Sequence, residues 1–300
     1  MTLPPPPFPP HSPARTAALT GIALLAFAGN SLLCRAALRH TTIDAASFTS
    51  VRLVSGALML AILVGWRSRH QRAGAGWLQA GDWVSALALF VYAAGFSFAY
   101  LSLSAATGAL LLFGVVQTSM IGWGLWRGER LRPLQWLGLA AAGAGLVWLL
   151  LPGLATPSLA AGVLMACAGV GWAVYTLRGR TAGDAMAVTA GNFLRAAPLA
   201  LALSLLTLAQ ARWDAAGLAL ALASGALASG LGYAVWYTAL RGLSATRAAI
   251  LQLGVPVLAS AGGVLLLGEP LTPQLLIASM AVLGGVALVI IGRPAAASPR

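Results

Sequence analysis

The phrase GERLRP at residues 128–133 returns as GEPLTP at residues 268–273, with its glycine, glutamate, leucine and proline in register. Upstream, the stretch LSAATGALL from Leu103 is echoed by LSATRAAIL from Leu243. Both echoes lie 140 residues apart. Two shared phrases at one offset indicate an internal duplication.

The composition places this duplicated chain in a lipid bilayer. Hydrophobic residues make up 59% of the 300 residues and charged residues only 8%. A soluble domain of this length needs many more charged side chains to cover its surface, whereas hydrocarbon tolerates an apolar exterior. We therefore expect an all-α integral membrane protein, and the soluble globular classes are excluded.

Apolar runs long enough to cross the hydrocarbon core, about 20 residues each, begin at ten places. These starts lie near Ala17, Asp44, Asp82, Ala105, Pro133, Ser158, Asp184, Asp214, Ala245 and Pro273. Five precede the linker LPGLATPS at residues 151–158 and five follow it. The sequence therefore predicts ten transmembrane helices in two five-helix repeats, residues 17–151 and 158–292.

An odd number of crossings per repeat reverses the second copy in the membrane. Inverted repeats recur in secondary transporters, where the substrate binds between the two halves. The duplication thus predicts a carrier that works by alternating access.

The basic residues predict the orientation. The chain contains no lysine, and in this topology nearly all loop arginines fall on the side of the termini, against Arg39 and Arg212 on the other side. The positive-inside rule then places both termini in the cytoplasm. Residues 1–16 are predicted to form a disordered proline-rich tail, and residues 293–300 a second cytoplasmic tail. A net charge of +12 spread over short loops does not favour a nucleic-acid partner.

The acidic residues stand near the predicted helix ends. Four aspartates open predicted helices: Asp44, Asp82, Asp184 and Asp214. A carboxylate there accepts a hydrogen bond from an unpaired backbone N–H. Glu129 and Glu269 precede Pro133 and Pro273, which suit the first turn of the following helix. We interpret the repeated phrase as a helix-to-helix corner; a proton relay through these carboxylates is the alternative.

Aromatic residues form stripes on two predicted helices. The third helix carries Tyr92, Phe96 and Tyr100, the eighth carries Tyr233, Trp236 and Tyr237, and the sixth adds Trp172. Spacings of three and four residues place side chains on one helix face. We predict that these rings line the substrate cavity; contact with lipid is the alternative.

Polar residues deep inside predicted helices complete the candidate site. Asn30, Gln117 and Gln252 could hydrogen-bond a substrate, or they could join helix to helix. Arg52 and Arg195 lie several residues inside helices two and seven. Either could hold a substrate carboxylate, and capping the carbonyls of a neighbouring helix is an equal alternative.

The ten predicted helices and the Gly-Glu phrases after helices four and nine resemble the EamA-type carriers of the drug/metabolite transporter superfamily. The resemblance covers about Ala17 to Arg293. It implies a multi-pass carrier of the bacterial inner membrane, often an exporter of amino acids, and the bacterial aromatic amino-acid exporters are a similar branch. One departure is that Pro256 has Val116 as its counterpart.

The function predicted is export of small metabolites, namely amino acids including aromatic ones, by facilitated diffusion or exchange. The absence of a carboxylate from the predicted helix interiors favours this over carboxylate-based proton antiport. A polyspecific drug and metabolite efflux carrier is the alternative. An integral-membrane enzyme is disfavoured because His11, His40 and His70 lie outside the predicted spans and no catalytic constellation is visible. No metal or cofactor is expected.

Overall fold

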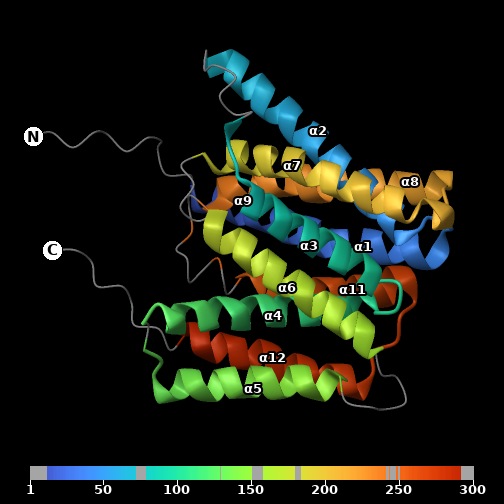
Figure 1. Ribbon diagram of the computed structural model, residues 1–300. Coiled ribbons are helices and arrows are strands. Elements are labelled where there is room, and N and C mark those ends of the chain that lie inside the picture. The colour runs from blue at the N-terminus through green and yellow to red at the C-terminus, as the bar shows by residue number, and fades with distance from the viewer. Residues whose placement is uncertain are drawn as a thin grey trace, which may run out of the picture.

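The computed structural model describes residues 12–71, 79–128, 130–150, 158–179, 184–240, 243, 248 and 251–291, and every regular element in these ranges is helical. The helices, drawn in Figure 1, are α1 (Pro13–His40), α2 (Ala45–Gln71), α3 (Trp83–Ala99), α4 (Ala105–Trp126), α5 (Pro133–Leu150), α6 (Leu159–Gly179), α7 (Ala185–Leu206), η2 (Leu208–Gln210), α8 (Ala215–Leu222), η3 (Ala223–Leu231), α9 (Gly232–Leu240), α11 (Gly254–Leu267) and α12 (Pro273–Ile291).

Eight helical stretches in the described ranges are long and apolar enough to cross a membrane. One of them, Ala215–Ala239, consists of α8, η3 and most of α9, so these three elements are a single long helix. The apolar helices α3 and α11 are shorter. The predicted start at Ala245 lies outside the described residues, and α11 begins at Gly254.

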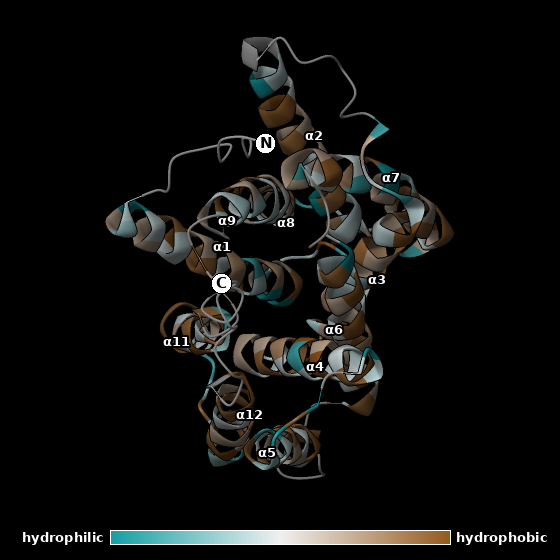
Figure 2. Ribbon diagram, turned by 90° about the vertical axis from the view of Figure 1, so that its left-hand side faces the viewer, coloured by the Kyte–Doolittle hydropathy of each residue, from teal (hydrophilic) through white to brown (hydrophobic). Residues whose placement is uncertain are grey.

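Apolar side chains cover the outside of the helix bundle. Leu206 is 86% exposed and Leu265 81% exposed, which in water would be an unfavourable surface. Figure 2 shows hydrophobic residues on the outer sides of α11 and α12. The helical hydrogen bonding satisfies the backbone within each segment, as a chain in hydrocarbon requires. The chain is a multi-pass membrane protein.

The helix contacts form matched sets. Helix α3 packs on α6, as α1 packs on the α8–η3–α9 helix. Helix α4 packs on α6, as α1 packs on α11. Helix α2 packs on the α8–η3–α9 helix, as α7 packs on α3, and the remaining major contacts join α2 to α7, α4 to α11, and α5 to α12. Replacing each helix of the first five by the corresponding helix of the second five, and the reverse, turns this set of contacts into itself.

The contact between α5 and α12 depends on small residues. A Cβ atom added to Gly138 would collide with the carbonyl oxygen of Gly285, and a Cβ added to Gly285 would collide with that of Gly138. Glycine at both positions lets the two backbones approach closely, as is common where membrane helices pack without a hydrophobic driving force.

The predicted helix caps are confirmed. The side chains of Asp82, Asp184 and Asp214 accept hydrogen bonds from the backbone N–H groups that open α3, α7 and α8. Asp44 accepts from the Ser47 N–H at 2.9 Å. The second oxygen of Asp44 accepts from the Arg212 N–H at 3.0 Å, and that of Asp214 accepts from the Thr42 N–H at 2.9 Å. Two loops are thereby joined reciprocally.

The glycines of the two corner phrases, Gly128 and Gly268, adopt a left-handed backbone conformation. Gly128 has φ +90° and Gly268 has φ +62°, in the left-handed region where a residue without Cβ is favoured. Pro133 and Pro273 begin α5 and α12, as predicted. Glu129 lies outside the described residues.

The aspartate caps predict how stability depends on pH. Although burial alone would raise the pKa of Asp44, hydrogen bonds from Ser47 and from the Arg212 N–H lower it below its ordinary value. A lowered pKa in the folded state contributes stability above the unfolded value, about 3.9, which is lost as the pH falls through the folded value. We expect the thermal midpoint of the solubilised protein to fall as the pH drops below about 4.

Asp44→Ala should lower the midpoint at pH 7, where a lost cap costs about 0.5–2 kcal/mol, and should weaken the acid dependence. Asp44→Asn is the matched control because asparagine caps as well as aspartate. Equal midpoints for all three proteins at pH 7 would contradict this role for Asp44.

Candidate functional site

A small cavity lies between α1, α3, α4, α6 and the η3–α9 segment. The residues that line it include Phe27, Asn30, Tyr92, Phe96, Trp172 and Tyr233. Its volume is about 20 Å³, which is room for one water molecule. Five predicted site residues therefore meet at one place, which is nearly closed in this conformation.

The predicted aromatic stripes meet through Trp172. The Trp172 ring lies 4.8 Å from that of Tyr92 on α3 and 5.2 Å from that of Tyr233 on α9, measured between centroids. Tyr92 also lies 5.5 Å from Phe96, and Phe27 on α1 lies 5.8 Å from Tyr233. Tilted rings at these distances attract one another beyond simple burial. The wall of the cavity is a continuous aromatic network.

Other predicted site residues do not line the cavity: Tyr100, Gln117, Trp236, Tyr237 and Gln252. Tyr100 caps the end of α3, and its hydroxyl lies 3.3 Å from the Ala105 carbonyl oxygen. Trp236 packs edge-on against Phe27, with ring centroids 5.7 Å apart. Tyr100, Trp236 and Tyr237 belong to the predicted aromatic stripes, but each stripe extends beyond the cavity.

Hydrogen bonds join four helices behind the aromatic wall. The amide nitrogen of Asn30 donates to the Tyr92 hydroxyl at 3.3 Å, and its oxygen accepts from Ser224 at 2.6 Å. Arg52 on α2 donates from Nη2 to the Tyr92 hydroxyl at 2.8 Å and from Nε to Ser229 at 3.4 Å. Sequence reasoning did not single out Ser224 or Ser229.

The two serines belong to the π-helical segment η3, which sequence reasoning also missed. Such segments widen a helix by one residue per turn and are frequent at functional sites. A Cβ on Gly225 would collide with the Arg52 carbonyl oxygen, so glycine lets η3 approach α2 closely. The signal in the sequence is that the eighth predicted helix is several residues longer than the third.

Arg52 is a buried cation without a carboxylate. Arg52 is only 1% exposed. Its Cζ lies 5.0 Å from the centre of the Tyr92 ring and 4.9 Å from the centre of the Phe96 ring. Within the described residues, Nη1 has no hydrogen-bond partner and no ion pair includes Arg52. Ring faces compensate part of the buried charge through cation–π attraction.

Arg195 is placed differently. Its Nη1 donates to the carbonyl oxygens of Ala80 at 2.7 Å and Gly191 at 2.9 Å. Gly191 lies one turn back on the same helix α7, and Ala80 precedes α3, so Arg195 joins the start of α3 to α7 and does not cap the end of a neighbouring helix. Arg195 does not line the cavity.

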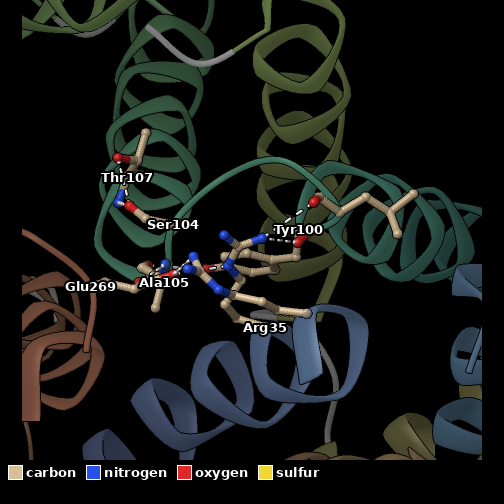
Figure 3. A network of polar contacts seen from close by, with 8 residues as sticks. Arg35, Tyr100, Ser104, Ala105, Thr107 and Glu269 are labelled. Carbon is tan, nitrogen blue, oxygen red and sulfur yellow. Dashed lines mark hydrogen bonds and ion pairs between the residues drawn. The ribbon is translucent and has the colours of Figure 1, made fainter. Parts of the chain in front are cut away.

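A second polar network, shown in Figure 3, joins α1 to α3, α4 and the corner after α11. Arg35 Nε donates to Glu269 Oε1 at 2.8 Å, and Arg35 Nη1 donates to the Tyr100 carbonyl oxygen at 2.9 Å. Glu269 Oε2 accepts from the Ala105 N–H at the start of α4, at 2.7 Å. The two charged side chains are 8% and 3% exposed. We call Arg35, Tyr100, Ala105 and Glu269 the ionic clasp.

The clasp corrects the interpretation of Glu269. The sequence predicted a helix-end residue at a corner, but the side chain is buried and faces the bundle. The physical reason is twofold: Arg35 needs a counter-ion, and the first N–H groups of α4 need an acceptor. Sequence reasoning missed Arg35, although its place deep in an apolar helix is the same signal that singled out Arg52.

The clasp predicts a large cost for breaking one side of a buried pair. Glu269→Gln leaves the Arg35 charge uncompensated and is expected to cost about 3–5 kcal/mol. The double replacement Arg35→Met and Glu269→Met should cost less than the sum of the two single changes. Thermal unfolding in detergent measures these differences.

Asp184→Asn is the matched control, because it weakens the exposed pair with Arg67 while keeping a capping side chain. An exposed pair contributes about 0–1 kcal/mol. If Glu269→Gln destabilised the protein no more than Asp184→Asn, the clasp would not be a stabilising element.

Comparison with known proteins agrees with this architecture. Residues 159–291 match the model of the EamA-like transporter family. A Pseudomonas aeruginosa protein, described as Uncharacterized protein PA1977, is 58% identical over 279 residues, which is 93% of this chain and 96% of that protein. The crystal structure of another protein shares the fold, with a TM-score of 0.63 and 20% identity over 91% of this chain and 96% of the other. The chain belongs to the EamA-like transporter family, within the drug/metabolite transporter superfamily.

Proposed function

We propose that this membrane transporter exports amino acids, including aromatic ones, by alternating access between two inverted five-helix repeats. The observation that carries the proposal is the aromatic cavity where α3, α6 and α9 meet α1. A ring entering it gains about 0.5–1.5 kcal/mol per favourable aromatic pair beyond burial. Tyr92, Phe96, Trp172 and Tyr233 offer such pairs.

The inverted repeat is supported by the matched helix contacts. An exchange of the two halves exchanges the contacts, as expected for a pseudo-two-fold axis in the membrane plane. In such carriers one half rocks against the other around a fixed site. The small, nearly closed cavity is then an intermediate or occluded arrangement, and the clasp must release or shift when that end of the bundle opens.

The proposal includes facilitated diffusion or exchange as the mode of transport. Glu269 is buried, but it is already neutralised by Arg35 and does not line the cavity. Among the described residues, no carboxylate lines the cavity where it could exchange a proton together with the substrate. A polyspecific efflux carrier would use the same aromatic walls, and competition by cationic drugs distinguishes it.

Trp172→Ala should reduce the uptake of labelled phenylalanine into proteoliposomes by about tenfold, because the ring joins both aromatic stripes. Alanine uptake should change less. Trp136→Ala is the control, since Trp136 is exposed on α5 and lies outside the cavity. Unchanged discrimination between phenylalanine and alanine would contradict the aromatic site. Uptake that becomes concentrative when a pH gradient is imposed would contradict facilitated transport.

The orientation proposed is a bacterial inner membrane with both termini in the cytoplasm. Single cysteines replacing Arg67 and Ala211, in a background without Cys34 and Cys167, probe opposite ends of the bundle. An impermeant thiol reagent added to intact cells should label position 211 and not position 67. The reverse pattern would overturn the orientation.

A further inference from the structure

The buried charges of the described residues are unequally paired. The charged residues buried there are Arg35, Arg52 and Glu269. Glu269 neutralises Arg35 in the clasp. Arg52 is left with a phenol, a serine and two ring faces, none of which carries a negative charge.

An uncompensated guanidinium in the interior of a membrane protein is costly. Arg52 also leaves Nη1 buried without a hydrogen-bond partner in the described part of the chain. A buried donor without a partner carries its full desolvation penalty. Both costs would be relieved by an anion that arrives from the cavity.

The geometry gives such an anion two donors. The rings of Tyr92 and Phe96 separate the guanidinium from the cavity that they line. The Tyr92 hydroxyl accepts hydrogen bonds from Arg52 and Asn30, so its own proton remains available to donate. A carboxylate bound at the Tyr92 hydroxyl would lie next to the guanidinium that donates to the same oxygen at 2.8 Å.

A substrate ammonium finds no corresponding partner. The described carboxylates are at the helix ends or in the clasp, and none lines the cavity. A cation would therefore enter beside Arg52 with no negative side chain to offset the repulsion. Only neutral groups such as the Asn30 amide remain for it.

We propose that Arg52, with the Tyr92 hydroxyl, binds the carboxylate of the transported solute, and that the site takes aromatic carboxylates as anions in preference to zwitterions with the same ring. This inference rests on the proposed function, since it uses the same aromatic cavity, and it shifts the preferred substrate from the amino-acid zwitterion to an aromatic carboxylate without an ammonium group. It also assigns the carboxylate to Arg52 rather than to Arg195, whose Nη1 is occupied by backbone carbonyls.

The test compares three compounds that share one phenyl ring: 3-phenylpropionate, phenylalanine and 2-phenylethylamine. They compete with labelled phenylalanine for uptake into proteoliposomes, and each is also titrated against the tryptophan fluorescence of the purified protein, since Trp172 lines the cavity. The wild-type protein should bind phenylpropionate more tightly than phenylalanine, and about tenfold to a hundredfold more tightly than the amine.

Arg52→Gln should remove most of that preference, while Arg52→Lys, which keeps the charge, should retain part of it. Arg195→Gln is the control and should leave the ratio of affinities unchanged even if it lowers stability. Because the readout is a ratio within one protein, a partial loss of folded material does not change it. If Arg52→Gln fails to fold, the affinity ratios of the Arg52→Lys and wild-type proteins still show whether the side chain at position 52 sets the preference for the carboxylate.

The outcomes separate this inference from the proposed function. If phenylalanine is transported but the three compounds bind equally, or Arg52→Gln leaves their ratio unchanged, the carboxylate site at Arg52 is wrong and amino-acid export stands. If no phenyl compound is transported but phenylpropionate binds in a manner that depends on Arg52, export of aromatic amino acids is wrong and the anion site stands.

Discussion

The need to neutralise a guanidinium buried between apolar helices organises this structure. Arg35 satisfies that need within the protein, because the Glu269 carboxylate and the Tyr100 carbonyl oxygen both accept from it. Glu269 in turn accepts from the first N–H of α4. One ion pair therefore fixes where α1, α3, α4 and the corner after α11 meet, and that end of the bundle cannot separate without new partners for all of them.

Arg52 is a second buried guanidinium, but no carboxylate among the described residues neutralises it. Its charge is held by the hydroxyl of Tyr92, by Ser229 and by the faces of two rings, all of which are neutral. The π-helical segment η3 supplies the serines and lets the backbone come close to α2. The Arg35 charge is thus paired with a carboxylate, whereas the Arg52 charge, behind the aromatic wall of the cavity, has only neutral groups beside it.

Local chemistry made much of the fold predictable. Glycines at Gly128 and Gly268 adopt positive φ, prolines open the next helices, and aspartates cap the helices that they precede. Each of these depends on residues close in sequence. The clasp depends on a pair 234 residues apart, Arg35 and Glu269, and no local pattern reports such a contact. Helical spacing correctly predicts that Tyr92, Phe96 and Tyr100 share one face, since their rings contact one another in order. Spacing alone does not predict that Tyr100 lies beyond the end of the cavity.

The duplicated sequence explains why the candidate site was harder to predict than the helix caps and the corners between helices. At the offset of 140, Asp44 corresponds to Asp184 and Glu129 to Glu269, so the capping and corner residues repeat. The site residues do not repeat.

At the same offset Arg35 meets Tyr175, Arg52 meets Asn192 and Tyr92 meets Gly232. Asn192 has a structural role, since its side chain accepts from the Asp82 N–H at 2.9 Å. A search for repeated residues therefore finds the helix caps and corners but misses the residues of the candidate site. Departures from the repeat at buried polar positions are the better guide, because the two halves contribute different residues to the cavity that lies between them.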